Sequence, residues 1–345
     1  MTHAMTNSIS QMASAAHSNH STRFGAIDSA KGVGIILVVF GHAWRGAMGA
    51  GLISDDRLFR YIDAAIYAFH MPLFFFLSGL LFLETLQKYD TGKLLRGRLT
   101  RLLWPMALWT WLFFGLKLVA GGEANTPVTV ADFPLIPLPP YEHLWFLWAL
   151  FLIQGILVLL FAALPKSLDA WQLRRFASSF GMLMVALSSF IFVPSLLWGP
   201  MVEHAPYFLL GIGAGGLLHL RPPLAVGALG ALGFGILTGL VGGEKASVLH
   251  SVALLVCAWA AWLFVDGALD PNGLIARSLR YLGQASMAIY LTHTAFTAAV
   301  RIVMLKVGAA DFALVLPASV LAGLIFPLFV LFAARKLGAT KLLGF

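Results

Sequence analysis

The protein has 345 residues, of which 59% are hydrophobic and only 11% are charged, and its mean hydropathy is +0.86. These values exclude a soluble globular domain, and the long unbroken apolar runs exclude a membrane β-barrel. The net charge of +8 does not indicate a nucleic-acid partner, because the basic residues fall in short connections between apolar runs. We therefore expect an all-α integral membrane protein whose basic residues face anionic membrane lipids.

The N-terminal segment, residues 1–22, is rich in Ser, Ala, His and Thr and has no apolar core. It is therefore neither a signal peptide nor a membrane-spanning helix, and we expect a disordered cytoplasmic tail. Residues 23–345 show no break in composition and are expected to form one membrane domain. The single cysteine, Cys257, lies in an apolar run, so intrachain disulfides and cysteine-cluster metal sites are excluded.

Ten apolar runs are long enough to cross about 30 Å of hydrocarbon. They cover residues 31–50, 61–86, 99–120, 142–164, 176–194, 198–219, 222–241, 247–266, 281–305 and 311–335. Basic residues concentrate near both ends and in the even-numbered connections. They are Arg23, Lys31, Lys88, Lys93, Arg96, Arg98, Arg101, Lys166, Arg174, Arg175, Arg221, Arg277, Arg280, Arg335, Lys336 and Lys341. This pattern predicts about ten transmembrane helices in one bundle, with both termini cytoplasmic.

The first connection departs from the pattern, because it also carries basic residues. Its basic residues are Arg45, Arg57 and Arg60. Their charge is partly balanced by the acidic residues Asp55, Asp56 and Asp63.

The first apolar run carries two ionisable residues in its part up to His42, Lys31 and His42 itself. Eleven residues correspond to about 1,100° of α-helical rotation, so both side chains lie within roughly 20° of one face and about 16 Å apart along the axis. Lys31 then marks the cytoplasmic edge, and His42 lies near the middle of the bilayer. Ionisable residues at such depth indicate function. Asp28, one turn before Lys31, either orients it or starts the helix.

Two further histidines, His70 and His293, are expected at a similar depth, roughly 14 to 18 Å from the nearer membrane edge. They either bond a neighbouring carbonyl and hold helices together, or join His42 in a site. In the second case we expect a catalytic role for His70 and a substrate contact from His293. No carboxylate or further histidine follows at helical ligand spacing, so we expect no metal.

Arg98 and Arg101 lie three residues apart, and α-helical spacing places them on one face at the cytoplasmic start of the third helix. They either anchor the topology or bind the phosphates of a nucleotide-containing donor, since guanidinium groups pair well with phosphate.

Glu142, His143 and Trp145 open the fourth helix at the outer face. They form either an interfacial aromatic belt or a binding surface for a sugar, whose apolar face stacks on rings. Farther along, Gly211 and its neighbours match a dinucleotide-binding pattern by letter. No strand precedes them, and we expect close helix packing instead.

The segments KGVGIILVVFGH, FHMPLFFFLSGLLF, RGRLTRLLWP, HLWFLWALF and LGQASMAIYLTHTAF occur in this order between the first and ninth runs. Together they resemble the acyltransferase 3 family of membrane proteins, in the branch of fucose O-acetylases and exopolysaccharide or lipopolysaccharide O-acetyltransferases. The resemblance implies a ten-helix acyltransferase bundle in the bacterial inner membrane. It also implies acetyl transfer from cytoplasmic acetyl-CoA, a co-substrate, to a hydroxyl of a glycan or lipid-linked sugar.

The family has a motif in which a basic residue is followed by ten residues and a histidine. In this sequence the motif falls on Lys31 and His42, with Lys where many members have Arg. A lysine pairs with phosphate but not bidentately. The family's Arg-x-x-Arg falls on Arg98 and Arg101, which implies a role in holding the donor together with Lys31. Many relatives carry an additional periplasmic domain for which this chain is too short, so we expect a self-sufficient membrane acetylase.

The expected mechanism brings the thioester to His42. The imidazole acts either as general base toward the acceptor hydroxyl or as a nucleophile that forms an acetyl-histidine intermediate. The sequence leaves this choice, the acceptor's identity and the oligomeric state open.

Two other functions are compatible with polar residues at the midplane. A transporter or flippase of a lipid-linked glycan precursor also uses them, but no internal repeat is evident. A purely structural membrane partner leaves three midplane histidines unexplained.

Overall fold

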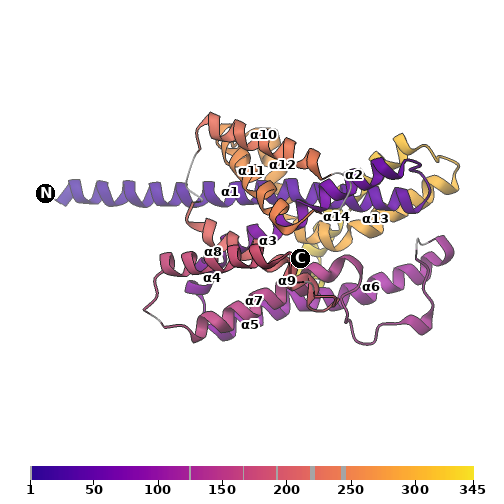
Figure 1. Ribbon diagram of the computed structural model, residues 1–345, viewed down its shortest axis with the longest axis horizontal. Helices are drawn as coiled ribbons and strands as arrows, with labels where there is room; N and C mark the ends of the chain where they lie inside the picture. The colour runs from indigo at the N-terminus through magenta and orange to yellow at the C-terminus, as the bar shows by residue number, and fades with distance from the viewer. Residues whose placement is uncertain (1, 124–125, 166, 192, 218–221, 242–245) are drawn as a thin grey trace.

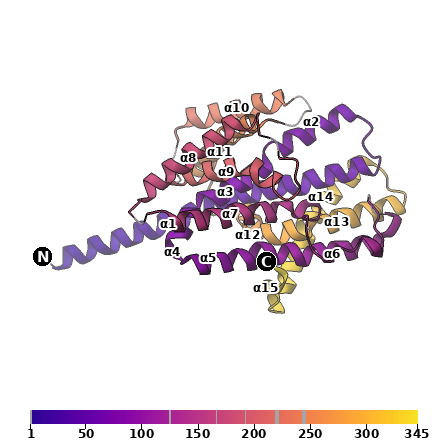
Figure 2. The same ribbon diagram turned by 60° about the horizontal axis from the view of Figure 1, so that its bottom comes forward.

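The computed structural model describes residues 2–123, 126–165, 167–191, 193–217, 222–241 and 246–345, with side chains from residue 25 onward. Every regular element in this part of the chain is helical (Figures 1 and 2). The longer elements are α1 (Thr2–Gly49), α2 (Asp56–Tyr67), α3 (His70–Leu80), α4 (Phe82–Lys88), α5 (Thr91–Arg98), α6 (Trp104–Ala120), α7 (Trp145–Ala163), α8 (Ala170–Leu187), α9 (Gly199–Ala214), α10 (Leu224–Leu240), α11 (Val248–Ala268), α12 (Leu274–Gln284), α13 (Ser286–Lys306) and α14 (Phe312–Lys336). Shorter ones are the π-helical turn η1 (Leu99–Leu103), the 3-10 turns η2 (Gly121–Glu123), η3 (Val130–Asp132), η4 (Glu142–Leu144) and η5 (Gly215–Leu217), and α15 (Thr340–Leu343).

Seven helical segments of the described chain are long and apolar enough to cross a membrane. They are Gly25–Gly49, Asp56–Lys88, Thr91–Glu123, Glu142–Ala163, Val248–Ala268, Ser286–Lys306 and Phe312–Lys336, while α10 is apolar but shorter. The prediction of an all-α integral membrane protein is confirmed, and the number of ten spanning helices stays a prediction.

Some sequence-based expectations fall where the structure describes little. Lys166 and Arg221, two of the basic residues behind the predicted orientation, lie outside the described residues. The helix α1 begins at Thr2, but the side chains of residues 1–24 are outside the described set, so the disordered tail over 1–22 stays a prediction.

The second predicted helix, 61–86, is wrong as a single element, because the chain forms α2, α3 and α4 there. The first of them starts earlier than predicted, since the Asp55 side chain accepts hydrogen bonds from two backbone amides of its first turn. Pro72 lies in the first turn of α3, where a missing backbone N–H is tolerated, whereas inside one continuous helix it removes a hydrogen bond. His70 therefore begins a helix.

The third and ninth predicted helices also have different bounds. The run predicted over 99–120 is preceded by α5 and enters α6 through the π-helical turn η1. The run predicted over 281–305 is divided at Ala285, whose ψ of 0° interrupts the helix between α12 and α13. Run length did not indicate these breaks, because it carries no information about the backbone conformation within a run.

Helix α1 is the element around which the others gather, and it contacts α2, α3, α11, α12, α13 and α14. Its approach to α12 is close, because a Cβ at Gly283 would overlap the backbone carbonyl of Asp28. The pair α3 and α9 is equally close, since a Cβ at Gly211 would overlap the carbonyl of Phe76. The expectation that Gly211 serves helix packing is confirmed.

Candidate functional site

Three histidine rings from separate parts of the chain form one cluster, termed here the histidine trio. His42 lies on α1, His143 in the turn η4 and His293 on α13. The ring centroids are 5.5 Å apart for His42 and His143, 5.0 Å for His42 and His293, and 5.4 Å for His143 and His293. The trio thus joins two histidines expected at the midplane with one that was expected at the outer mouth.

Hydrogen bonding within the trio is incomplete. The Nδ1 atom of His293 lies 2.9 Å from the carbonyl oxygen of Ile289 and 2.8 Å from that of Tyr290, so Nδ1 is assigned as the donor. The Nε2 atom of His293 and both ring nitrogens of His143 are buried without a partner among the described residues. Because buried polar atoms normally have partners, these three nitrogens mark a place for a polar ligand.

His42 differs from the other two in its accessibility. His293 is 0% exposed and His143 is 7% exposed, whereas His42 is partly exposed. Its ring also makes no hydrogen bond within the described part of the chain. Of the three imidazoles, His42 is therefore the one that an incoming molecule can reach.

Two aromatic residues complete the wall around His143. The Tyr290 hydroxyl donates a hydrogen bond to the backbone carbonyl of His143, and the two ring centroids are 5.4 Å apart. The Phe113 ring lies 5.0 Å from the same imidazole. Sequence analysis missed both residues. Tyr290 stands three positions before His293, a spacing that places both on one helix face, whereas Phe113 carried no comparable signal.

The turn η4 separates residues that were expected to act together. Only His143 joins the trio, because consecutive side chains of a 3-10 turn point in different directions. Glu142 instead forms an ion pair with Lys117 of α6, and its backbone has a positive φ of 44°, which a non-glycine residue adopts only when its surroundings hold it there. Trp145 contacts the buried ring of His204, at 5.0 Å between centroids.

His70, at the start of α3, makes no ring contact with the trio among the described residues, although its ring lies near enough to His42 for charges on the two to interact. Its Nδ1 atom is 2.7 Å from the carbonyl oxygen of Ile66, and its ring is 4.5 Å from that of Tyr67. The Arg45 guanidinium lies 3.3 Å from the Tyr67 ring centroid and binds both carboxylate oxygens of Asp63, at 2.6 and 2.8 Å. These residues, Arg45, Asp63, Tyr67 and His70, are termed the arginine cluster. The cluster includes Arg45, one of the arginines in the first connection that do not fit the predicted orientation.

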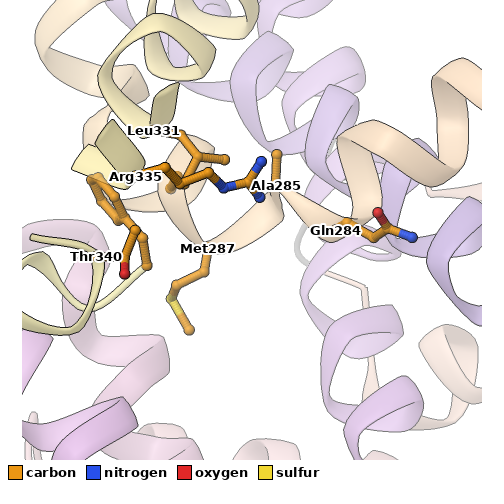
Figure 3. A pocket seen from close by; sticks show the side chains of 8 residues that line it. Gln284, Ala285, Met287, Leu331, Arg335 and Thr340 are labelled. Atoms are coloured by element: carbon orange, nitrogen blue, oxygen red, sulfur yellow. The ribbon is translucent and has the colours of Figure 1, made fainter. Parts of the chain in front are cut away.

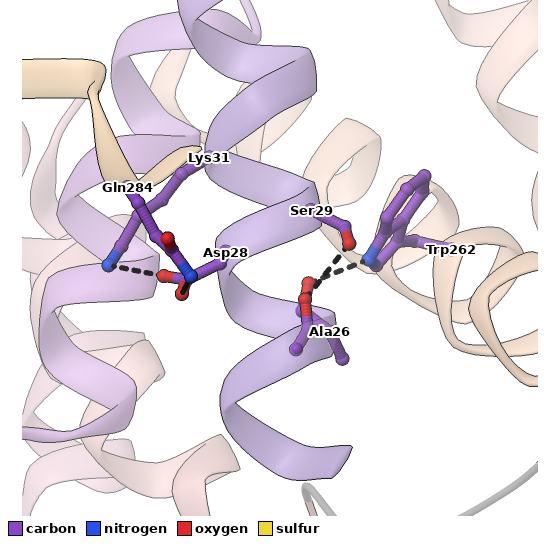
Figure 4. A network of polar contacts seen from close by, with 7 residues as sticks. Ala26, Asp28, Ser29, Lys31, Trp262 and Gln284 are labelled. Carbon is purple, nitrogen blue, oxygen red and sulfur yellow. Dashed lines mark hydrogen bonds and ion pairs between the residues drawn. The ribbon is translucent and has the colours of Figure 1, made fainter. Parts of the chain in front are cut away.

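Lys31 and His42 both lie on α1, as predicted, but Lys31 is already paired. Its Nζ atom is 3.3 Å from Oδ1 of Asp28, and the side-chain amide of Gln284 donates to Oδ2 of Asp28 at 3.2 Å (Figure 4). Asp28 lies inside α1, so the expectation that it starts the helix is wrong and the orienting alternative is supported.

Arg98 and Arg101 lie on either side of the change from α5 to η1. The wider π-helical turn replaces the α-helical spacing from which a shared face was predicted. Arg98 is partly buried and its Nε atom has no partner among the described residues, whereas Arg101 is exposed. Both guanidinium groups therefore retain bonding capacity for an anion.

The described residues contain no group of three or more His, Cys, Asp or Glu side chains that could hold a metal ion. In the trio itself, the Nδ1 atom of His293 is occupied by two backbone carbonyls. The expectation of a metal-free site stays a prediction.

Comparison with known proteins identifies the family. The family model described as an acyltransferase domain matches residues 24–334. That range runs from α1 to the end of α14 and includes the histidine trio, Lys31 and both arginines, Arg98 and Arg101.

Two curated relatives are nodulation proteins NolL. The protein from Sinorhizobium fredii is 33% identical over 185 residues, which are 53% of this chain and 46% of the relative. The protein from Mesorhizobium japonicum is 29% identical over 188 residues, which are 54% of this chain and 46% of the relative. The alignments therefore span about half the length of the curated relatives. No solved structure matches the chain. On the strength of the family match and the apolar helices, the chain belongs to the acyltransferase 3 family of multi-pass membrane proteins.

Proposed function

We propose that this membrane acyltransferase transfers an acetyl group from cytoplasmic acetyl-CoA to a hydroxyl of a sugar in a cell-surface or exported glycan. The observation that carries the proposal is the histidine trio, in which one accessible imidazole stands beside three buried ring nitrogens without partners. A group-transfer site needs both a base that substrates reach and polar atoms that are satisfied only when substrates are bound. The proposed location is the inner membrane of a bacterium.

His42 is the proposed general base. A nitrogen lone pair of its neutral imidazole takes the proton of the acceptor hydroxyl while the oxygen attacks the thioester carbonyl carbon. The carbon–sulfur bond of the resulting tetrahedral intermediate then breaks, the acetyl ester remains on the sugar, and the proton passes from His42 to the departing CoA sulfur. The alternative route, in which His42 itself carries the acetyl group, uses the same atoms in two steps.

His143 and His293 have complementary roles in this proposal. A neutral His143 presents one N–H donor and one acceptor, and the donor suits the oxygen on which negative charge develops. The Nε2 atom of His293, which has no partner among the described residues, accepts a hydrogen bond from the acceptor hydroxyl or from His42. The ring centroids of His293 and His42 are 5.0 Å apart. The trio thereby positions the acceptor as well as the base.

The proposed substrate contacts extend to both sides of the trio. Arg98, Arg101 and Lys31 hold the donor phosphates on the cytoplasmic side. Glu142 and Trp145 contact the acceptor on the outer side, where His70 assists its binding. Acyl transfer is favoured over the transporter and structural alternatives by the match to an acyltransferase family.

The test uses protein purified in detergent, acetyl-CoA and a panel of glycan and lipid-linked sugar acceptors, with CoA release and acceptor mass as readouts. The proposal expects stoichiometric CoA release and a mass increase of one acetyl group on at least one acceptor. Movement of a glycan across proteoliposomes without donor consumption would instead support the flippase alternative.

A further inference from the structure

A pocket of about 250 Å³ lies between the start of α13, the end of α14 and the last residues of the chain (Figure 3). Gln284, Ala288, Arg335 and Phe345 are among the residues that line it. The volume is below the range of pockets that enclose a whole nucleotide-sized ligand, so a narrow molecule or one arm of a larger one fits better. None of its lining residues belongs to the trio.

Helix α13 contributes residues to both the pocket and the trio. Ala288 lines the pocket, and His293 lies five residues later, which corresponds to a rise of about 7.5 Å along the helix. Tyr290, which holds the backbone of His143, lies between them. Ala288 and His293 are thus one to two helical turns apart along the axis, and their side chains lie roughly 140° apart around it.

A chain of aromatic rings leads from Phe345, which lines the pocket, to His143. The ring of Phe345 lies 6.1 Å from that of Trp109, Trp109 lies 5.7 Å from Phe113, and Phe113 lies 5.0 Å from His143. The chain end is held there by hydrogen bonds, because the indole N–H groups of Trp104 and Trp109 donate to backbone carbonyls of α15 at 2.7 and 2.9 Å. Trp109 and Phe113 belong to α6, which directly follows η1, where Arg101 lies.

The rim of the pocket carries positive charge without a matching acid. The Arg335 guanidinium, which points toward Ala285 in Figure 3, makes no ion pair or hydrogen bond within the described part of the chain. Gln284 also lines the pocket and binds Asp28, whose other carboxylate oxygen pairs with Lys31. The pocket and the Lys31 pair are thus adjacent, and an anion at the rim meets one free cation.

We infer that this pocket binds the phosphopantetheine arm of the acyl donor, with Arg335 contacting a phosphate and the thioester directed toward the trio. The inference rests on the proposed acyl transfer. The arm has a phosphate at one end, amides and methyl groups along its length and the thioester at the other end. The pocket has a guanidinium at its rim, polar side chains from Gln284 and Thr340, and apolar ones from Met287 and Phe345. The pocket therefore offers a partner for each chemical part of the arm outside the thioester.

The charge contact is tested by Arg335→Gln, with Lys336→Gln as the matched control. Lys336 belongs to the same helical turn, but its Nζ atom lies 4.7 Å from the Phe332 ring centroid and it does not line the pocket. Arg335→Gln should weaken CoA binding about tenfold, the loss expected for one charge-assisted hydrogen bond, and leave pantetheine binding unchanged because pantetheine has no phosphate. Lys336→Gln should change neither. Calorimetry on the purified protein gives both affinities without requiring turnover.

The arm contact is tested by Ala288→Leu, which fills the pocket, with the exposed Ala299→Leu on the same helix as control. Filling should weaken both CoA and pantetheine at least tenfold, and the control should weaken neither. Equal CoA affinity in Arg335→Gln and the wild type overturns the inference, as does an equal loss of both ligands in that variant. Because Arg335→Gln alone decides this, the inference stays testable if Ala288→Leu fails to fold.

Acetyl-CoA and an acetylated carrier protein are compared as donors, because both present the same arm. Transfer from either one fits the inference, and the preferred one identifies the source of the arm. If CoA binding responds to Arg335→Gln but no acceptor is acetylated from either donor, the proposed function fails and the pocket assignment stands. If acetylation proceeds and Arg335→Gln leaves the CoA affinity unchanged, the pocket assignment alone fails.

Discussion

The histidine trio and the arginine cluster are both polar groups inside an apolar bundle, yet their hydrogen bonding differs. In the arginine cluster the Arg45 and Asp63 charges neutralise each other through two short bonds, and the Nδ1 atom of His70 bonds a backbone carbonyl. The Tyr67 hydroxyl is the one buried polar side-chain atom of this cluster that has no partner among the described residues. In the trio three buried ring nitrogens have no partner among the described residues. Since an unpaired buried polar group costs stability, the paired charges of Arg45 and Asp63 suit a structural role, whereas the three nitrogens of the trio suit a site completed by substrate.

The largest effect is expected for His42→Ala. Removing the accessible imidazole should lower the acetyl-transfer rate by at least 10²- to 10⁴-fold, the range typical of general bases, while thermal stability and CoA affinity stay near wild type. The rate is measured by mass spectrometry of the acceptor. A well-folded variant with near-normal transfer would remove His42 from the mechanism.

His143 should follow, because its orphaned nitrogens are expected to meet the developing negative charge. His143→Phe, which keeps a ring but no N–H, should lower kcat by about 10²-fold. His143→Gln, which keeps a donor, should recover part of the loss. The kcat values of the two variants are compared at saturating donor. If His143→Phe is more active than His143→Gln, the ring only fills space.

A smaller effect is expected for the ion pair that holds η4. Reversing one charge, Lys117→Glu or Glu142→Lys, should displace His143 and lower kcat about fivefold, which corresponds to a coupling of about 1 kcal/mol. The double reversal should restore most of the rate. Single variants that match the wild type, or a double variant no better than either single one, would show that the pair does not position the turn.

The arginine cluster should give the opposite outcome, with stability affected more than activity. Arg45→Met removes a bidentate contact and should lower the stability by about 1 kcal/mol, a shift of a few degrees in Tm, while kcat stays within about twofold. Arg60→Met is the control, because its pair with Asp56 is 4.0 Å long and both side chains are exposed. A large loss of activity in Arg45→Met without loss of stability would show that this cluster belongs to the catalytic site.

The properties that depend on the local pattern of residues could be predicted from the amino-acid sequence alone. Apolar run length and composition predicted an all-helical membrane protein, and the spacing of Lys31 and His42 placed both on one helix. Short motifs in a fixed order indicated the family that the comparison then confirmed. Such properties are set by residues close in sequence, so no knowledge of the neighbours of a helix is required.

Neighbour relations were decided only by the tertiary structure. Depth counting put His70, His293 and His42 at one level but carried no information about direction around each helix axis. The bundle turned His293 toward His42, brought in His143 from the outer turn and left His70 beside Tyr67.

The breaks and the pocket depended on tertiary packing in the same way. The run predicted over 61–86 is divided into α2, α3 and α4, and the run predicted over 281–305 is divided at Ala285. The pocket combines Gln284, Arg335 and Phe345, and the Phe345 ring contacts that of Trp109 on α6. The physical reason is that hydrophobic burial fixes which residues leave water, whereas close packing between specific helix faces determines which buried residues meet.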